Sequence, residues 1–216
     1  MTAPVRLPSA SAIADVLALR GGDGWLSPPL HPRVPAAIAV RGTALTIELE
    51  HRASGADFSP MYDVLSATME GRILVVAGAN GIHGAVWGEI LSIAALRSGA
   101  VGVLVDGMVR DLPAVASLGL PLYSTSTGVV GPYGTAHVVQ VGGRVDIDGI
   151  VVDDGDEIVL DASGGVRISA AEADEILDGA LAYEDGEAEL VAALQRGEPL
   201  SSAYRYKATV VARLRR

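Results

Sequence analysis

The chain has 216 residues, of which 50% are hydrophobic and only 4% aromatic, and its net charge is −10. This composition is typical of one globular domain with an aliphatic core, and the acidic balance argues against a nucleic-acid partner, whose phosphates require basic surfaces. Because cysteine is absent, disulfides, thiol nucleophiles and cysteine-based zinc sites are excluded. No signal peptide is recognisable and no apolar run reaches membrane-spanning length, so we expect a cytoplasmic protein without a membrane partner.

The first 35 residues are predicted to form an arm that contains one short helix. This helix is expected over Ser11–Leu19, with Ser11 as its cap and the pair Gly21-Gly22 as its end. The proline-rich stretch from there to residue 35 should be irregular. Apolar and polar residues then alternate between residues 36 and 50, which favours a half-buried strand. A helix is predicted over Pro60–Met69, because proline is well tolerated in a first turn.

The centre of the chain has the pattern strand, glycine loop, helix, strand. Two almost wholly apolar runs, Ile73–Ala77 and Val101–Val105, suit strands that are buried on both faces. Between them, Ala85–Arg97 has apolar residues at helical spacing, and Gly99 lies where a left-handed residue would end the helix. A βαβ unit of this kind makes its two strands parallel. The loops that follow the two strands should therefore leave the same edge of the sheet, where open α/β sheets bind ligands.

In the second half of the chain, one short predicted helix is followed by a series of short predicted strands. Asp111 is a candidate cap for a short helix over Pro113–Ser117, and a strand over Pro121–Ser124 and a Gly/Ser/Thr-rich loop to residue 136 should follow. Short apolar runs between glycine and aspartate turns then predict a β-meander that packs a second sheet on the first. These runs are Val138–Val141, Val145–Ile147, Ile150–Val152, Glu157–Leu160 and Val166–Ile168.

A C-terminal extension from residue 170 to 216 is predicted to be helical, with helices over Ala171–Leu181 and Glu184–Gln195. These helices would either clasp a neighbouring subunit or cover one face of the sheet. The predicted fold class is α/β: a mainly parallel sheet based on the βαβ unit, a smaller stacked β-meander and C-terminal helices, all in one domain of residues 1–216.

A candidate site follows from the edge at which the two loops meet. Arg110 and Asp111 come directly after the second strand, and Glu89 lies at the start of the intervening helix. A helix start offers unpaired backbone N–H groups, so a cation, a carboxylate and several amides could converge there on one small anionic ligand. An isolated Arg-Asp pair is more often a solvated turn, but its place at this edge and Glu89 opposite it favour a site. With few histidines present, hard carboxylate ligands suit Mg²⁺ or Mn²⁺.

Other chemistries find little support in the residues. The four histidines form no His-x-x-x-His pair, which disfavours zinc. The loop Gly78–Gly84 suggests dinucleotide binding, but Asn80 stands where the second glycine of that pattern belongs. Neither a phosphate-binding G-x-x-x-x-G-K-[S/T] loop nor a G-x-S-x-G nucleophile motif occurs.

The segment from Gly88 to Asp111 resembles the 4-hydroxy-4-methyl-2-oxoglutarate aldolase family, which also contains the regulators of ribonuclease E activity. The shared signature is an acidic residue, twenty intervening residues and then Arg-Asp, here Glu89 followed by Arg110-Asp111. The resemblance implies a swivelling β/β/α fold and a class II pyruvate aldolase that requires Mg²⁺ or Mn²⁺. Such enzymes cleave 4-hydroxy-2-oxo dicarboxylic acids to pyruvate and a second oxo acid, and they also decarboxylate oxaloacetate.

The resemblance also implies roles for individual residues. Asp111 would hold the metal, with Glu89 nearby through waters, while Arg110 and the amides of Gly88, Glu89, Ile90 and Leu91 would hold the pyruvyl carboxylate. Catalysis would thus rest on Arg110, Asp111 and Glu89, and the assembly would be a homotrimer or a hexamer. Two rivals stay open: a non-catalytic, protein-binding regulator, and a nucleotide-dependent oxidoreductase, which the broken glycine pattern disfavours.

Overall fold

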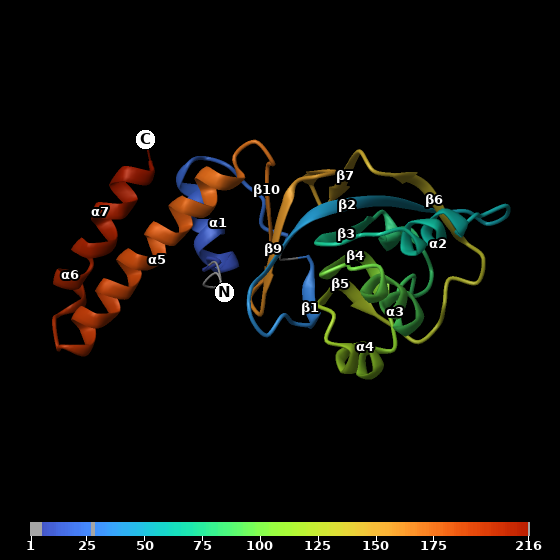
Figure 1. Ribbon diagram of the computed structural model, residues 1–216, viewed down its shortest axis with the longest axis horizontal. Coiled ribbons are helices and arrows are strands. Elements are labelled where there is room, and N and C mark those ends of the chain that lie inside the picture. Colours follow the sequence, from blue (N-terminus) through green and yellow to red (C-terminus); the bar gives the residue numbers. More distant parts are fainter. Residues whose placement is uncertain (1–5, 27–28, 216) are drawn as a thin grey trace.

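A computed structural model describes residues 6–26 and 29–215 of the chain (Figure 1). Its largest element is an eight-stranded sheet, in which seven strands follow the order β1-β5-β4-β3-β2-β9-β10 and the eighth, β6, also pairs with β2. These strands are β1 (His31–Val34), β2 (Val40–His51), β3 (Arg72–Ala77), β4 (Gly102–Val109), β5 (Leu122–Thr127), β6 (Ala136–Val141), β9 (Glu157–Asp161) and β10 (Gly164–Ile168).

The centre of the sheet is parallel. β3 pairs in parallel with both β2 and β4, and β4 pairs in parallel with β5. Residues Ile73–Ala77 are all buried, as expected for a strand that is covered on both faces. The predicted βαβ unit and the α/β fold class are therefore confirmed, and the loops after β3 and β4 leave the sheet at one edge.

Antiparallel strands extend this centre on both sides. β1 pairs with β5 at one edge, where the missing N–H of Pro32 is tolerated, so the stretch up to residue 35 is not wholly irregular as predicted. The predicted meander is real, but most of it joins the main sheet, because β6 and β9 both pair with the long strand β2. Only β7 (Arg144–Ile147) and β8 (Ile150–Asp153) form a separate antiparallel sheet.

Three helices cover one face of the parallel centre. They are α2 (Ser59–Ser66), α3 (Glu89–Arg97) and α4 (Leu112–Leu118). Together with side chains from β2 to β5 they bury one large apolar cluster that includes Met61, Leu74 and Trp87. The opposite face packs against the β7–β8 hairpin in a second cluster around Leu104 and Tyr123. Because both faces of the parallel centre are packed, the strand ends that carry the candidate site are held in place.

A helical arm lies at the other end of the long axis (Figure 1). It consists of α1 (Ala10–Leu19), α5 (Ala173–Gln195), α6 (Leu200–Ala203) and α7 (Arg205–Leu214), and its apolar cluster reaches β9 and β10. Two predictions need correction: Ser9 rather than Ser11 caps α1, and one continuous helix replaces the two expected after residue 170. Gly186 lets α5 approach Val210 of α7 closely. No helix within residues 6–26 and 29–215 is both long and apolar enough to cross a membrane.

Candidate active site at the β3–α3 and β4–α4 loops

The segment before α3 is extended and hydrogen-bonded to the end of β4. The amide of Val86 donates to the carbonyl of Met108 (3.0 Å), and the amide of Arg110 donates to the carbonyl of Trp87 (2.9 Å). Trp87 thereby forms a parallel bridge with Val109. Because these backbone groups bond across to β4, α3 starts at Glu89 and not at Ala85 as the apolar spacing predicted.

The first turn of α3 is fixed by a small buried network. The indole N–H of Trp87 donates to the Ser92 hydroxyl (2.9 Å), which donates in turn to the carbonyl of Gly88 (2.9 Å). The first amides of an α-helix have no partner within the helix itself. Here the N-cap residue is Gly88, which has no side chain to accept from them. The helix start is therefore held rigidly and presents N–H groups towards the loop after β4.

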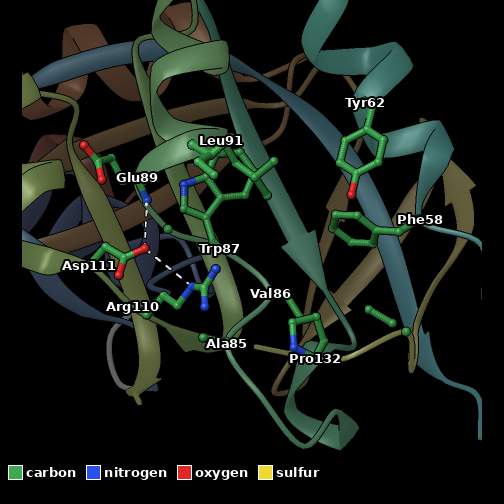
Figure 2. Close-up of a pocket in the computed structure, with 14 residues that line it drawn as sticks. Phe58, Tyr62, Ala85, Val86, Trp87, Glu89, Leu91, Arg110, Asp111 and Pro132 are labelled. Carbon is green, nitrogen blue, oxygen red and sulfur yellow. Dashed lines mark hydrogen bonds and ion pairs between the residues drawn. The ribbon is translucent and has the colours of Figure 1, made fainter. Parts of the chain in front are cut away.

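Arg110 and Asp111 lie directly beside this helix start (Figure 2). The Asp111 Oδ2 atom is 3.5 Å from the amide nitrogen of Glu89 and 3.4 Å from Nε of Arg110. Both side chains are about two-fifths exposed, so they remain accessible to a ligand. Asp111 occupies the N-cap position of α4, where its carbonyl accepts from the amides of Ala114 and Val115, but its side chain makes no cap hydrogen bond. The predicted cap position is thus confirmed, but the side chain does not form the cap bond and its carboxylate is directed to α3 instead.

Two backbone features make this approach feasible. Asp111 has φ of 59°, a left-handed conformation that is uncommon outside glycine and turns the side chain back towards α3. A Cβ atom at Gly88 would lie only 2.7 Å from Asp111 Oδ2 and 3.0 Å from Cγ of Arg110. The close packing of the three residues therefore depends on the missing side chain at position 88.

These residues form one end of a pocket of about 300 Å³. All the predicted site residues line it: Gly88, Glu89, Ile90, Leu91, Arg110 and Asp111. The Glu89 carboxylate points away from Arg110 in Figure 2, so the backbone amide of Glu89, rather than its acid, faces Asp111. The structure thus brings the predicted residues together, with Glu89 on the outer side.

The other end of the pocket contains residues that sequence reasoning missed. Phe58 is the N-cap residue of α2 and Tyr62 lies in its first turn, whereas Pro132 comes from the loop before β6 and Ala136 is the first residue of β6. The two rings are in edge-to-face contact, with centroids 5.6 Å apart. A signal existed in the i, i+4 spacing of two aromatic residues in a chain with few aromatics, but nothing in the sequence placed α2 beside α3.

A polar cluster around the buried Asp106 supports the glycine loop after β3. The Asp106 carboxylate accepts a hydrogen bond from the side-chain amide of Asn80, whose oxygen accepts one from the Thr125 hydroxyl (2.8 Å). Burial raises the pKa of Asp106 above its ordinary value, against hydrogen bonds from Gly78 and Asn80 that lower it. Asn80, the residue that breaks the dinucleotide pattern, therefore has a structural role in anchoring this loop to β4.

The donor atoms at the site fit a hard divalent cation held mainly by water and ligand. No group of three or more histidine, aspartate or glutamate side chains that could enclose a metal occurs within residues 6–26 and 29–215. Asp111 offers one accessible carboxylate, and Mg²⁺ commonly accepts one or two carboxylates and retains its waters. Nucleophilic lysine chemistry does not fit, because the single lysine of the chain, Lys207, is on α7 and pairs with Glu187.

Comparisons with known proteins agree with this architecture. A Vibrio cholerae protein named "Putative 4-hydroxy-4-methyl-2-oxoglutarate aldolase" is 30% identical over 57% of this chain and 73% of its own length. Protein DlpA of Legionella pneumophila is 24% identical over 90% of this chain, which spans only about a third (32%) of that larger protein.

Two solved structures are similar over most of both chains. An uncharacterized protein from Pseudomonas syringae pv. tomato has a TM-score of 0.79 at 26% identity, covering 91% of this chain and 92% of the other. Streptomyces coelicolor RraAS2, described as an unusual member of the RNase ES inhibitor RraA protein family, has a TM-score of 0.73 at 26% identity, covering 83% and 90%. The RraA-like family model (Aldolase/RraA) matches residues 10–167, which include the whole site. The resemblance found in the Glu89–Asp111 segment is thereby confirmed, and the chain belongs to the RraA-like (Aldolase/RraA) family.

Proposed function

We propose that this chain is a lyase that requires a divalent cation and releases pyruvate from 4-hydroxy-2-oxo acids of the 4-hydroxy-4-methyl-2-oxoglutarate type, with oxaloacetate decarboxylation as a side activity. One observation carries the proposal: a guanidinium, a carboxylate and the start of a helix converge at one end of a single pocket. The name of the Vibrio cholerae relative supports the reaction class.

Arg110 is the residue that would bind the substrate carboxylate. Its guanidinium can form two parallel hydrogen bonds to a carboxylate, and the amides of the first turn of α3 add donors beside it. This anchoring leaves the 2-oxo group next to Asp111. A Mg²⁺ or Mn²⁺ ion held by Asp111 would supply positive charge for the oxygen that becomes negative in the reaction.

The reaction then needs few further groups from the chain. The C4 hydroxyl loses its proton, the C3–C4 bond breaks and the electron pair of that bond moves towards the 2-oxo group. The fragment that contains C4 departs as an aldehyde or a second oxo acid, and the fragment of C1 to C3 is left as an enolate. The resulting enolate takes up a proton at C3 and becomes pyruvate. In oxaloacetate the same bond breaks and carbon dioxide leaves, so both activities depend on stabilising one enolate.

The test is pyruvate release from oxaloacetate and from 4-hydroxy-4-methyl-2-oxoglutarate, measured with added Mg²⁺ or Mn²⁺ and with EDTA. We expect the wild type to release pyruvate and EDTA to abolish this release. The variant Asp111→Ala should release none, even with added metal. Asp178→Ala, which removes an exposed aspartate on α5, is the matched control and should behave as the wild type. Turnover by Asp111→Ala at the wild-type rate would refute the assignment.

A second candidate is a non-catalytic regulator that binds another protein. The likeness to Streptomyces coelicolor RraAS2 favours it. The same assay separates the two, because a regulator releases no pyruvate with any divalent metal.

We further propose a homotrimer or a hexamer, as the family resemblance implies. A monomeric mass by light scattering at micromolar concentration would contradict this assembly.

A further inference from the structure

The hydroxyl of Ser92 makes a contact that is common in helices, but at an uncommon place. Three other serines of the described chain donate to a carbonyl four residues earlier, and all lie at or next to the C-terminal end of a helix: Ser66, Ser98 and Ser117. Ser92 instead donates at the start of α3, to the carbonyl of the N-cap residue Gly88. It therefore acts on the end of the helix that faces the pocket.

The carbonyl of Gly88 is held by two hydrogen bonds, one from the Ser92 amide (3.0 Å) and one from the Ser92 hydroxyl (2.9 Å). This carbonyl and the N–H of Glu89 belong to one planar trans peptide, so the two groups point in opposite directions. Holding the carbonyl towards the helix therefore directs the N–H out of it. The N–H faces Asp111 Oδ2, at 3.5 Å from the nitrogen, as the dashed line in Figure 2 shows.

The Gly88–Glu89 peptide needs this restraint because an ordinary cap is impossible there. At most helix starts the side chain of a serine, threonine, aspartate or asparagine accepts from the first amides. A Cβ atom at position 88 would lie only 2.7 Å from Asp111 Oδ2, so the site excludes such a residue. Glycine also leaves the backbone freer to rotate. A rotated peptide would turn a carbonyl oxygen, instead of a donor, towards a ligand carboxylate.

The restraint lies wholly inside the chain. Ser92 is 0% exposed and Trp87 is 1% exposed, and the indole N–H of Trp87 donates to the Ser92 hydroxyl at 2.9 Å. Because the hydroxyl accepts from the indole, its own proton is left for the Gly88 carbonyl. A neighbouring subunit cannot reach either side chain, so the arrangement does not depend on the state of assembly.

We infer that Ser92 is a positioning residue for the carboxylate of the oxo acid. By holding the Gly88 carbonyl, it keeps the Glu89 amide directed into the pocket beside Arg110, and Trp87 orients the hydroxyl that does so. Ser92 is not among the residues that line the pocket, so it acts through the Gly88–Glu89 peptide. This inference rests on the proposed function and deepens it.

Pyruvate binding to Ser92→Ala tests the inference. Alanine favours a helix and removes only the hydroxyl. Calorimetry with Mg²⁺ should show a dissociation constant for pyruvate that is about three- to tenfold higher, the scale of one hydrogen bond, at unchanged stoichiometry. KM for oxaloacetate should rise by a similar factor while kcat stays nearly constant, because a donor that holds the substrate and the transition state equally affects binding alone.

A purely structural role of Ser92 would give the opposite pattern. Partial unfolding lowers kcat and the calorimetric stoichiometry together, and leaves KM and the dissociation constant unchanged. Ser98→Ala is the matched control, because it removes a hydroxyl bonded to the Ala94 carbonyl (3.0 Å) at the far end of α3, and it should change neither constant. If Ser92→Ala does not fold, Ser92→Cys replaces it, since a thiol of similar size is only a weak donor and should weaken pyruvate binding in the same way.

The outcomes separate this inference from the proposed function. If the Ser92 variant binds pyruvate as tightly as the wild type, or if Ser98→Ala weakens binding equally, the positioning role is refuted and the lyase is unaffected. If no oxo acid is cleaved but the wild type binds pyruvate more tightly than the Ser92 variant, the lyase is refuted and the positioning role stands. If the wild type does not bind pyruvate, the positioning role is refuted, whether or not oxaloacetate is decarboxylated.

Discussion

Gly88→Ala is the most direct test of how the site is built. The added Cβ would lie 2.7 Å from Asp111 Oδ2, whereas ordinary contacts begin near 3.4 Å, so the carboxylate must retreat by about 0.7 Å. Arg110 is also crowded, because its Cγ would be 3.0 Å from the same atom. Backbone strain adds little, since Gly88 has φ of −171°, which alanine can adopt.

A displacement of this size should affect catalysis far more than stability. Misplacing a catalytic group by about 1 Å can cost on the order of 100-fold, so we expect kcat/KM for oxaloacetate to fall roughly tenfold or more. Stability should change by only about 0.5 kcal/mol, because the crowded side chains are partly exposed and can rotate.

The assay is coupled pyruvate release, with a thermal melt on the same samples. Gly81→Ala is the matched control, because a Cβ atom there meets no atom within 4 Å. Wild-type activity in Gly88→Ala would show that the position of Asp111 is not critical. If Gly88→Ala loses activity because it unfolds, as the thermal melt would show, the expected small effect on stability is wrong.

Three other changes probe different parts of the molecule. Arg110→Lys keeps the charge but loses the paired hydrogen bonds, so steady-state kinetics should show a loss of about 1–3 kcal/mol and much weaker inhibition by pyruvate; unchanged inhibition would contradict the anchoring role. The raised pKa of Asp106 means that the folded state keeps this proton to higher pH than the unfolded chain, so this group destabilises the fold as pH rises above about 4. The stability of Asp106→Asn relative to the wild type should therefore increase between pH 4 and 7 in urea titrations, and a constant difference would refute the assignment. Gly186→Val should force α5 and α7 apart, because a Cβ atom would lie 2.8 Å from a methyl group of Val210. We expect a cost of about 1–3 kcal/mol, seen as faster amide exchange in α7 but not in β3 or β4.

The sequence predicted the parts of the fold that depend on local burial. Ile73–Ala77 and Val101–Val105 are apolar throughout and too short for a typical helix, which favours strands covered on both faces. Their order around a helix then determined the parallel pairing and the shared edge. The meeting of Arg110 and Asp111 with the start of α3 followed from this topology and required no knowledge of side-chain positions.

The sequence could not predict features that long-range pairing decides. The apolar spacing from Ala85 onward suits a helix, but Val86 donates its amide to the carbonyl of Met108 and Trp87 accepts from the amide of Arg110, and these bonds hold the two residues extended. Phe58 and Tyr62 belong to a helix whose place beside α3 is set by packing across the sheet. Asp111 looked like a helix cap because that role is common for aspartate, whereas its left-handed backbone turns the carboxylate away from α4.

The bridge between Trp87 and Val109 has an evolutionary consequence. It joins the two halves of the site through main-chain atoms, so their relative position does not depend on which side chains follow. A lineage could replace Arg110 or Asp111 and lose its chemistry while the backbone of the site kept its shape. Proteins named as aldolases and proteins named as inhibitors can therefore keep one backbone arrangement around the site while the chemistry of its side chains differs.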